Sequence, residues 1–171
     1  RRAWTEAGLR VRLARELAAS LAAAQLGPVI LAGPAAAFLT GLRRGAVRPV
    51  TEIHLLLPRS GLDRAVAHLA RLGWQLTWAL PTRPCRSWSA CVGLRRGADV
   101  LRLGWRHVQP PPWRTQVIEK GLFAAAPEML PAEELILSLL CPGAVWDGVI
   151  PWEADLAFLA DPLLDWQRVM T

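Results

Sequence analysis

The sequence predicts an α+β fold: a mixed β-sheet with flanking helices, followed by a helical C-terminal portion. Two observations lead to this class. Segments with the apolar spacing of helices first alternate with short apolar stretches bounded by glycine and proline, and three strand-like stretches then follow without a helix between them. The remainder of the chain has helical patterns, and this separation of strands from later helices is typical of α+β proteins.

The first part of the chain begins with an amphipathic helix. Residues 5–26 carry a leucine at every fourth position between Leu9 and Leu21, which gives the helix one apolar stripe. Gly27 and Pro28 are expected to end it, because glycine favours helix ends and proline does not continue a helix. A strand, a helix, a strand and a helix are then expected at 28–32, 34–42, 50–57 and 61–73.

The last of these helices has expected caps in Ser60 and Gly73. Three strands are then expected, at 74–80, 87–94 and 99–107. Three consecutive prolines at 110–112 exclude regular helix or central strand there. Helices are expected to make up the tail, at 131–140, 151–160 and 162–170. We interpret residues 1–126 as the α/β core and residues 127–171 as a helical portion packed on it, in one compact unit.

The composition is that of one domain. The chain has 171 residues, 53% of them hydrophobic, which is enough for a sizeable core. No apolar run reaches the roughly 18 to 20 residues that span a bilayer, and no secretory signal is visible. The cysteines, Cys85, Cys91 and Cys141, are odd in number, which predicts a reducing, cytoplasmic location without a disulfide scaffold. The chain begins with Arg1 rather than methionine, as a piece of a longer protein would.

The net charge of +6 makes a nucleic-acid-associated basic protein one candidate function. Lys120 is the only lysine, and asparagine and tyrosine are absent. This bias is typical of a GC-rich bacterial genome, so part of the arginine excess reflects codon composition rather than binding. The arginines that would serve this function are Arg43, Arg44, Arg48, Arg95, Arg96 and Arg106.

Several segments resemble one protein family when they are taken in order. They are "VILAGPAAAFL", "RPVTEIHLLLP" and "LDRAVAHLARLGW", followed by "LRLGW", "LILSLL", "ADLAFLA" and "LLDWQRV". Together they resemble the bacterial uncharacterised nucleotidyltransferase family of the DNA polymerase beta-like superfamily, over roughly residues 10–171. The resemblance implies a nucleotidyltransferase-like fold. It also implies carboxylates on adjacent strands that hold two magnesium ions and an NTP.

The residues that match the catalytic carboxylates of the family are altered in this chain. The resemblance places Glu52, His54 and Arg102 at the three acidic positions. Glu52 keeps the charge, but a neutral imidazole is a poor magnesium ligand and a guanidinium repels a cation. We therefore expect the three side chains to neutralise one another, with Glu52 pairing with Arg102 across the sheet. A repurposed ligand or anion site and residual metal-dependent transfer are the alternatives.

The nucleotide-binding positions are also changed in part. The resemblance places Ala32 where the family has a lysine, while Gly33 is kept and Pro34 follows it. Gly33 and Arg48 are the candidate nucleotide-binding residues that the resemblance leaves. No metal ligand set is expected, and a zinc site that joins His54 to His107 or Cys91 has no diagnostic spacing.

Three functions remain open. The first is a catalytically degenerate nucleotidyltransferase-fold protein that serves as a binding or scaffolding module. The second is an active enzyme that uses Mg²⁺ with an NTP to move a nucleotidyl group to a small molecule, peptide or protein. The third is the nucleic-acid-associated protein. The nine tryptophans, among them Trp88, Trp105, Trp113, Trp146 and Trp152, favour a protein partner or homo-oligomer. No cofactor is expected for the first function.

Overall fold

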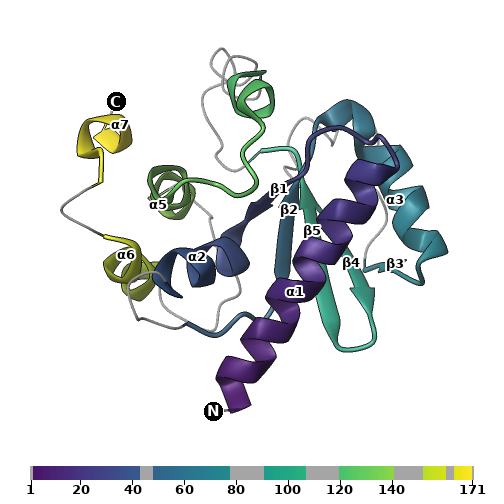
Figure 1. Ribbon diagram of the computed structural model, residues 1–171, viewed down its shortest axis with the longest axis horizontal. Coiled ribbons are helices and arrows are strands. Elements are labelled where there is room, and N and C mark those ends of the chain that lie inside the picture. Colours follow the sequence, from purple (N-terminus) through teal and green to yellow (C-terminus); the bar gives the residue numbers. More distant parts are fainter. Residues whose placement is uncertain are drawn as a thin grey trace.

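The computed structural model describes residues 2–42, 48–77, 91–106, 120–140, 152–160 and 164–170. Its centre is a five-stranded mixed sheet, and helices flank it (Figure 1). The strands are β1 (Ile30–Ala32), β2 (Ile53–Leu56), β3 (Gln75–Leu76), β4 (Cys91–Arg96) and β5 (Asp99–Gly104). The helices are α1 (Arg2–Ala23), α2 (Gly33–Leu42), α3 (Leu62–Arg71), α5 (Ala132–Leu140), α6 (Trp152–Leu159) and α7 (Trp166–Met170). The fold is α+β, as the sequence predicts.

The strands lie in the order β1-β2-β5-β4-β3. β2 and β5 are parallel neighbours, and every other pair in the sheet is antiparallel. β4 and β5 form a hairpin whose turn contains Gly97 at φ +59°, a left-handed conformation that glycine adopts without steric cost. Because β2 lies beside β5, the strand that carries His54 is next to the strand that carries Arg102. The predicted adjacency of these two strands is confirmed.

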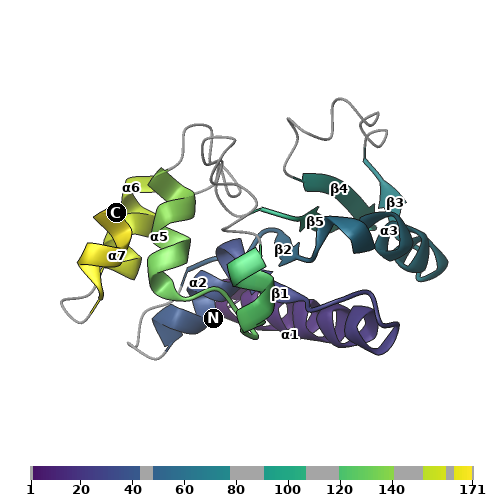
Figure 2. The same cartoon turned by 90° about the horizontal axis from the view of Figure 1, so that it is seen from above.

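One face of the sheet is apolar, and α1 covers it (Figures 1 and 2). Along each strand, side chains point alternately to this apolar face and to the opposite face, because strand side chains have a period of two. The buried residues on this face include Ile53, Leu55, Val92, Leu94, Leu101 and Leu103. Arg10 on α1 also donates a hydrogen bond of 2.7 Å to the carbonyl of Val50, which fixes the approach to β2. The opposite face, which we call the open face, carries the polar residues discussed below.

The C-terminal helices lie beyond β1, at one end of the sheet (Figures 1 and 2). α5 and α6 contact α2. The segment before α5 runs along β1, since the Leu31 N–H donates to the Glu128 carbonyl (2.9 Å) and the Leu130 N–H donates to the Leu31 carbonyl (2.8 Å). The helical tail therefore packs on the core, while the division between residues 126 and 127 stays a prediction. No helix in the described ranges combines the length and apolar character needed to cross a membrane.

The structure differs from the sequence prediction at several element ends. α1 begins at Arg2 rather than residue 5, and β4 ends at Arg96 rather than residue 94. α1 ends at Ala23 rather than residue 26, because Gln25 adopts φ +55° and the Leu26 N–H turns back to the Leu21 carbonyl (3.2 Å). The N-cap prediction for Ser60 is wrong. Residues Arg59–Gly61 form a 3₁₀ turn, and Gly61 is the N-cap of α3 without a side-chain hydrogen bond.

Candidate functional site

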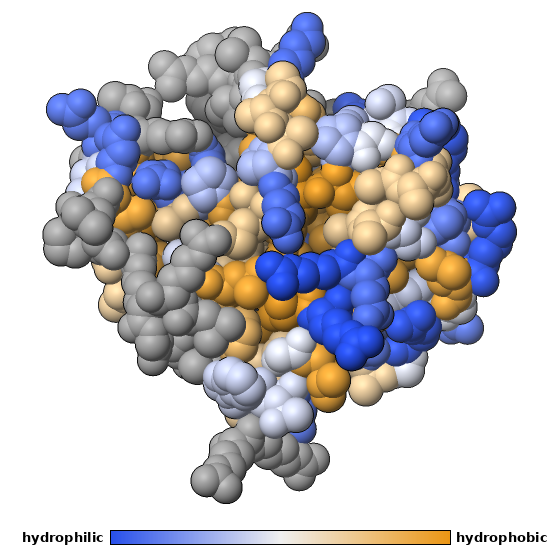
Figure 3. Space-filling model, viewed as in Figure 1, coloured by the Kyte–Doolittle hydropathy of each residue, from blue (hydrophilic) through white to orange (hydrophobic). Residues whose placement is uncertain are grey.

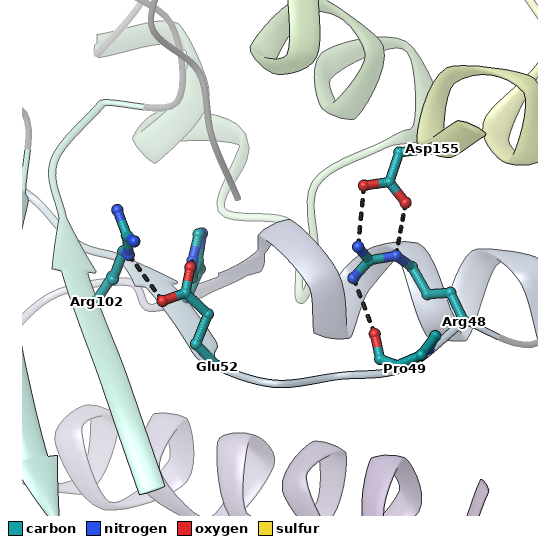
Figure 4. A network of polar contacts seen from close by, with 6 residues as sticks. Arg48, Pro49, Glu52, Arg102 and Asp155 are labelled. Carbon is teal, nitrogen blue, oxygen red and sulfur yellow. Dashed lines mark hydrogen bonds and ion pairs between the residues drawn. The ribbon is translucent and has the colours of Figure 1, made fainter. Parts of the chain in front are cut away.

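The open face brings together Glu52, His54 and Arg102, the three residues that the resemblance places at carboxylate positions. In the register of β2 and β5, His54 lies opposite Arg102, and on the other side of β2 Ala32 lies opposite His54. Glu52 directly precedes β2 and is two residues before His54, so alternation places both on the open face. Figure 4 shows the Glu52 and Arg102 side chains on the side of the sheet away from α1.

Glu52 uses both of its carboxylate oxygens within this cluster. Its Oε1 lies 2.7 Å from His54 Nε2, and its Oε2 accepts a hydrogen bond of 2.9 Å from Arg102 Nε (Figure 4). The Glu52 side chain is only 8% exposed. Short charge-assisted contacts of this kind compensate a carboxylate for its loss of water. The predicted pairing of Glu52 with Arg102 across the sheet is confirmed.

The pairing of Glu52 with Arg102 disfavours a divalent metal ion at this site. A divalent metal at Glu52 would have to displace the Arg102 guanidinium and then bind beside its positive charge. His54 offers a nitrogen where magnesium prefers oxygen. Within the described parts of the chain, no group of three or more histidine, cysteine, aspartate or glutamate side chains is placed to hold a metal ion. His107, considered above for zinc, lies outside the described residues.

Gly33 begins α2 directly beneath His54. It adopts φ +56°, and a Cβ on it would overlap His54 Nδ1 and lie 2.7 Å from His54 Cγ. The position therefore needs glycine for two reasons, backbone conformation and space. The imidazole fills the volume above the residue that the resemblance assigns to nucleotide binding. That role for Gly33 stays a prediction.

Arg48 lies in a second, separate ion pair. Its Nε and Nη2 donate to the two carboxylate oxygens of Asp155 on α6, at 2.6 and 2.9 Å, and its Nη1 donates to the Pro49 carbonyl (3.0 Å) (Figure 4). The side chains of Arg48 and Asp155 are 2% and 3% exposed. Such a bidentate, buried pair joins the segment before β2 to the C-terminal helices. Nucleotide binding by Arg48 stays a prediction, and its described contacts are internal to the protein.

The arginines of the nucleic-acid hypothesis do not form one surface in the described part of the chain. Arg48 is buried, whereas Arg95 is exposed on the open face. Arg96 stacks over the ring of Trp74, with its guanidinium carbon 4.9 Å from the ring centroid. Arg43 and Arg44 lie outside the described residues. The nucleic-acid hypothesis therefore gains no arginine cluster from the described part of the chain.

Cys91 lies beside this cluster, whereas the sequence indicated it only as a cysteine and as a zinc partner of His54 without diagnostic spacing. Gly93 lies opposite Arg102 in the β4–β5 register, so Cys91, two residues earlier, is on the same face and diagonal to Arg102. Burial raises the pKa of the Cys91 thiol above its ordinary value of 9.0. The Arg102 guanidinium lowers this pKa and the Glu52 carboxylate raises it further. The turn "RRGA" fixes the hairpin register, and alternation from it could have located this thiol.

The chain matches no protein-family model and no curated protein sequence. The resemblance to nucleotidyltransferases therefore stays a prediction from the order of segments in the sequence.

Proposed function

We propose that this protein is a nucleotidyltransferase-fold protein whose metal site is closed by an internal ion pair, and that it serves as a binding or scaffolding module. The observation that carries this proposal is the engagement of both Glu52 oxygens, one by His54 and the other by Arg102. In this family-based interpretation, Glu52 is the one remaining carboxylate of three. The three cysteines support a reducing, cytoplasmic setting.

The formal charge at these three positions disfavours the binding of two magnesium ions. Three carboxylates would contribute a formal charge of −3 to two magnesium ions, whereas the charges of Glu52 and Arg102 sum to zero and His54 supplies no negative charge. At an effective dielectric constant near 20, one unit charge about 4 Å from another is worth roughly 4 kcal/mol. The loss of several such terms disfavours tight metal binding, and so disfavours transfer by a two-metal route.

A partner-binding role draws support from the exposed aromatic residues. Trp4 on α1 and Trp166 on α7 are 53% and 41% exposed. Figure 3 shows apolar side chains lying between strongly hydrophilic ones on the face that α1 crosses. Tryptophan is a frequent anchor of protein interfaces. Trp105, by contrast, is buried, and Trp88, Trp113 and Trp146 lie outside the described residues.

The test is titration with Mg²⁺, Mn²⁺ and the four ribonucleotides, followed by mass spectrometry of the protein and of any co-purified acceptor. We expect no metal-dependent nucleotide incorporation. Glu6 is an exposed residue of α1, and Glu6→Ala is the control. Incorporation that is lost in Glu52→Ala but kept in Glu6→Ala would overturn the proposal in favour of an active nucleotidyltransferase.

A second pair of variants tests the assignment of the positions. His54→Asp with Arg102→Asp should create Mg²⁺ binding, because it restores three carboxylates on one face of the sheet. The control is Arg64→Asp with Arg71→Asp on α3, which adds even more negative charge at a distance. Equal Mg²⁺ binding by the two double variants would contradict the assignment.

A further inference from the structure

The open face contains a pocket that the Glu52 cluster only borders. Its volume is about 500 Å³, within the range of small-molecule sites. It extends from Glu52 across β5 and β4 to β3. The described residues that line it are Glu52, Gln75, Leu76, Thr77, Gly93, Arg95, Val100 and Arg102.

The pocket follows from the strand register. Gly93 lies opposite Arg102 on one side, and its carbonyl accepts a hydrogen bond of 3.0 Å from the Thr77 N–H on the other. Gly93, which has no side chain, therefore lies between Arg102 and Thr77, which both have one. The absence of a side chain at Gly93 lowers the floor of the sheet there, which produces the hollow.

The charges around the hollow are unbalanced. Arg95 and Arg102 each carry +1 and Glu52 carries −1, which leaves +1. Arg95 lies opposite Val100, so it is diagonal to Arg102 on the neighbouring strand, within reach for long side chains. Glu52 engages Arg102 through Nε. In the described part of the chain, no carboxylate pairs with Arg95.

We propose that this pocket binds a small organic anion, with its phosphate or carboxylate group between Arg95 and Arg102 and its apolar part over Gly93 and Val100. Guanidinium groups match the planar, multi-oxygen geometry of both anions. Gln75, which lies opposite Arg95, adds an amide at the same end. The 35% exposure of the Arg102 side chain leaves it accessible to a ligand while Glu52 holds its orientation.

This inference goes beyond the proposed function, because it needs neither a metal nor a nucleotide. The experiment measures binding of phenyl phosphate, benzoate and inorganic phosphate to the full chain by calorimetry at constant ionic strength. Phenyl phosphate and benzoate separate a phosphate preference from a carboxylate preference. We expect saturable binding of at least one aromatic anion, tighter than that of inorganic phosphate.

Two arginine variants give a matched comparison. Arg95→Gln and Arg64→Gln each remove one exposed positive charge, but only Arg95 lines the pocket. Arg95→Gln should weaken binding by about tenfold or more, the effect of losing one charge-assisted hydrogen bond. Arg64→Gln should leave the affinity nearly unchanged because distant surface charges are screened. Equal weakening by both variants would overturn the proposal, as would no saturable binding of any probe.

A third variant tests the shape of the site. Gly93→Val fills the floor without changing any charge, and valine is favourable in strands. It should abolish binding of the aromatic anion while the far-ultraviolet circular dichroism stays that of the parent. Unchanged affinity in Gly93→Val would place the anion outside this pocket. Nucleotide transfer with Mg²⁺ would overturn the proposed function but would not alter the comparison of Arg95 with Arg64.

Discussion

The contact between Gly33 and His54 is the tightest constraint on the open face at the scale of single residues. Gly33→Ala should destabilise the protein through two separate effects. The left-handed backbone conformation costs about 1 to 2 kcal/mol with a side chain, and overlap with the imidazole adds about 1 to 3 kcal/mol. In a His54→Ala background, most of the overlap cost should disappear. Urea denaturation of the four proteins of this double-mutant cycle measures the difference.

Gly97 provides the control for that cycle. Its φ of +59° resembles that of Gly33, but a Cβ there would meet no atom within 4 Å. Gly97→Ala should therefore show the backbone cost alone, about 1 to 2 kcal/mol. If Gly33→Ala is no more destabilising than Gly97→Ala, the imidazole does not occupy the space above α2.

The environment of Cys91 predicts a distinctive pH dependence. Since burial raises the pKa of this thiol, its alkylation by iodoacetamide should be slow at pH 8 and should still be increasing above pH 9.0. Glu52→Gln should shift the profile to lower pH, because the Glu52 charge raises this pKa. Peptide mass spectrometry separates Cys91 from Cys85 and Cys141.

The raised pKa of the Cys91 thiol also makes the free energy of unfolding depend on pH. A thiol whose folded-state pKa lies above its ordinary value of 9.0 contributes stability below that pH, and the contribution is lost as pH rises through the folded-state pKa.

For the alkylation experiment, Asp99→Asn, at the far end of β5, is the control that should leave the alkylation profile in place. A shift to higher pH in Glu52→Gln would contradict the described arrangement.

Residues of the site differed in how far the sequence could predict them. Strand alternation and the adjacency of two strands are sufficient to bring Glu52 to Arg102, so this pair was predictable. The register of β4 also places Cys91 beside them, but only after the hairpin turn is located. Asp155 is 107 residues from Arg48, and no local pattern links a residue on a helix to a partner at that separation.

At the scale of elements, the Arg48–Asp155 pair joins α6 to the segment before β2. Arg48→Ala should destabilise the protein by about 3 to 5 kcal/mol, because it removes the guanidinium that binds both oxygens of the buried Asp155 carboxylate. Arg48→Met with Asp155→Leu should recover most of this loss, since apolar replacement of a buried pair is often neutral. Urea denaturation with near-ultraviolet circular dichroism would measure both changes.

An exposed pair on α1 gives the reference for that measurement. Arg12 Nε lies 2.8 Å from Glu16 Oε1 in solvent, one helical turn away. Arg12→Ala should cost only about 0.3 to 0.5 kcal/mol, the usual value of such helix-surface pairs. A cost for Arg48→Ala no larger than this would show that α6 does not depend on the buried pair.

Helices with a strong apolar period were the most predictable elements. Leucine spacing predicted α1, although its buried side chains are Ala7, Val11, Ala14, Leu17 and Leu21, while Leu9 is 60% exposed. α3 lies within the expected range 61–73, but its C-cap is Leu72 rather than Gly73, which follows at φ +84°. The ends were less predictable, because they depend on single backbone conformations such as that of Gln25 and on the 3₁₀ turn that displaces Ser60 from the N-cap. Local propensity does not specify either feature.

At the scale of the whole molecule, the sheet combines local and distant pairings. β4 and β5 form a hairpin that the intervening "RRGA" predicts, whereas the parallel pairing of β2 with β5 joins strands separated by β3, β4 and α3. Composition and periodicity predict the class α+β, but they do not determine the order of strands. The order β1-β2-β5-β4-β3 depends on which apolar faces meet after the chain collapses.

The separation of Arg48 from Asp155 also has a consequence during synthesis on the ribosome. The chain grows by about 5 to 20 residues per second, so the carboxylate emerges roughly 5 to 20 s after the guanidinium it will bind. During this interval, the Arg48 guanidinium cannot form its two hydrogen bonds to Asp155. The pairing that accompanies the native burial of Arg48 therefore requires α6 to have been translated.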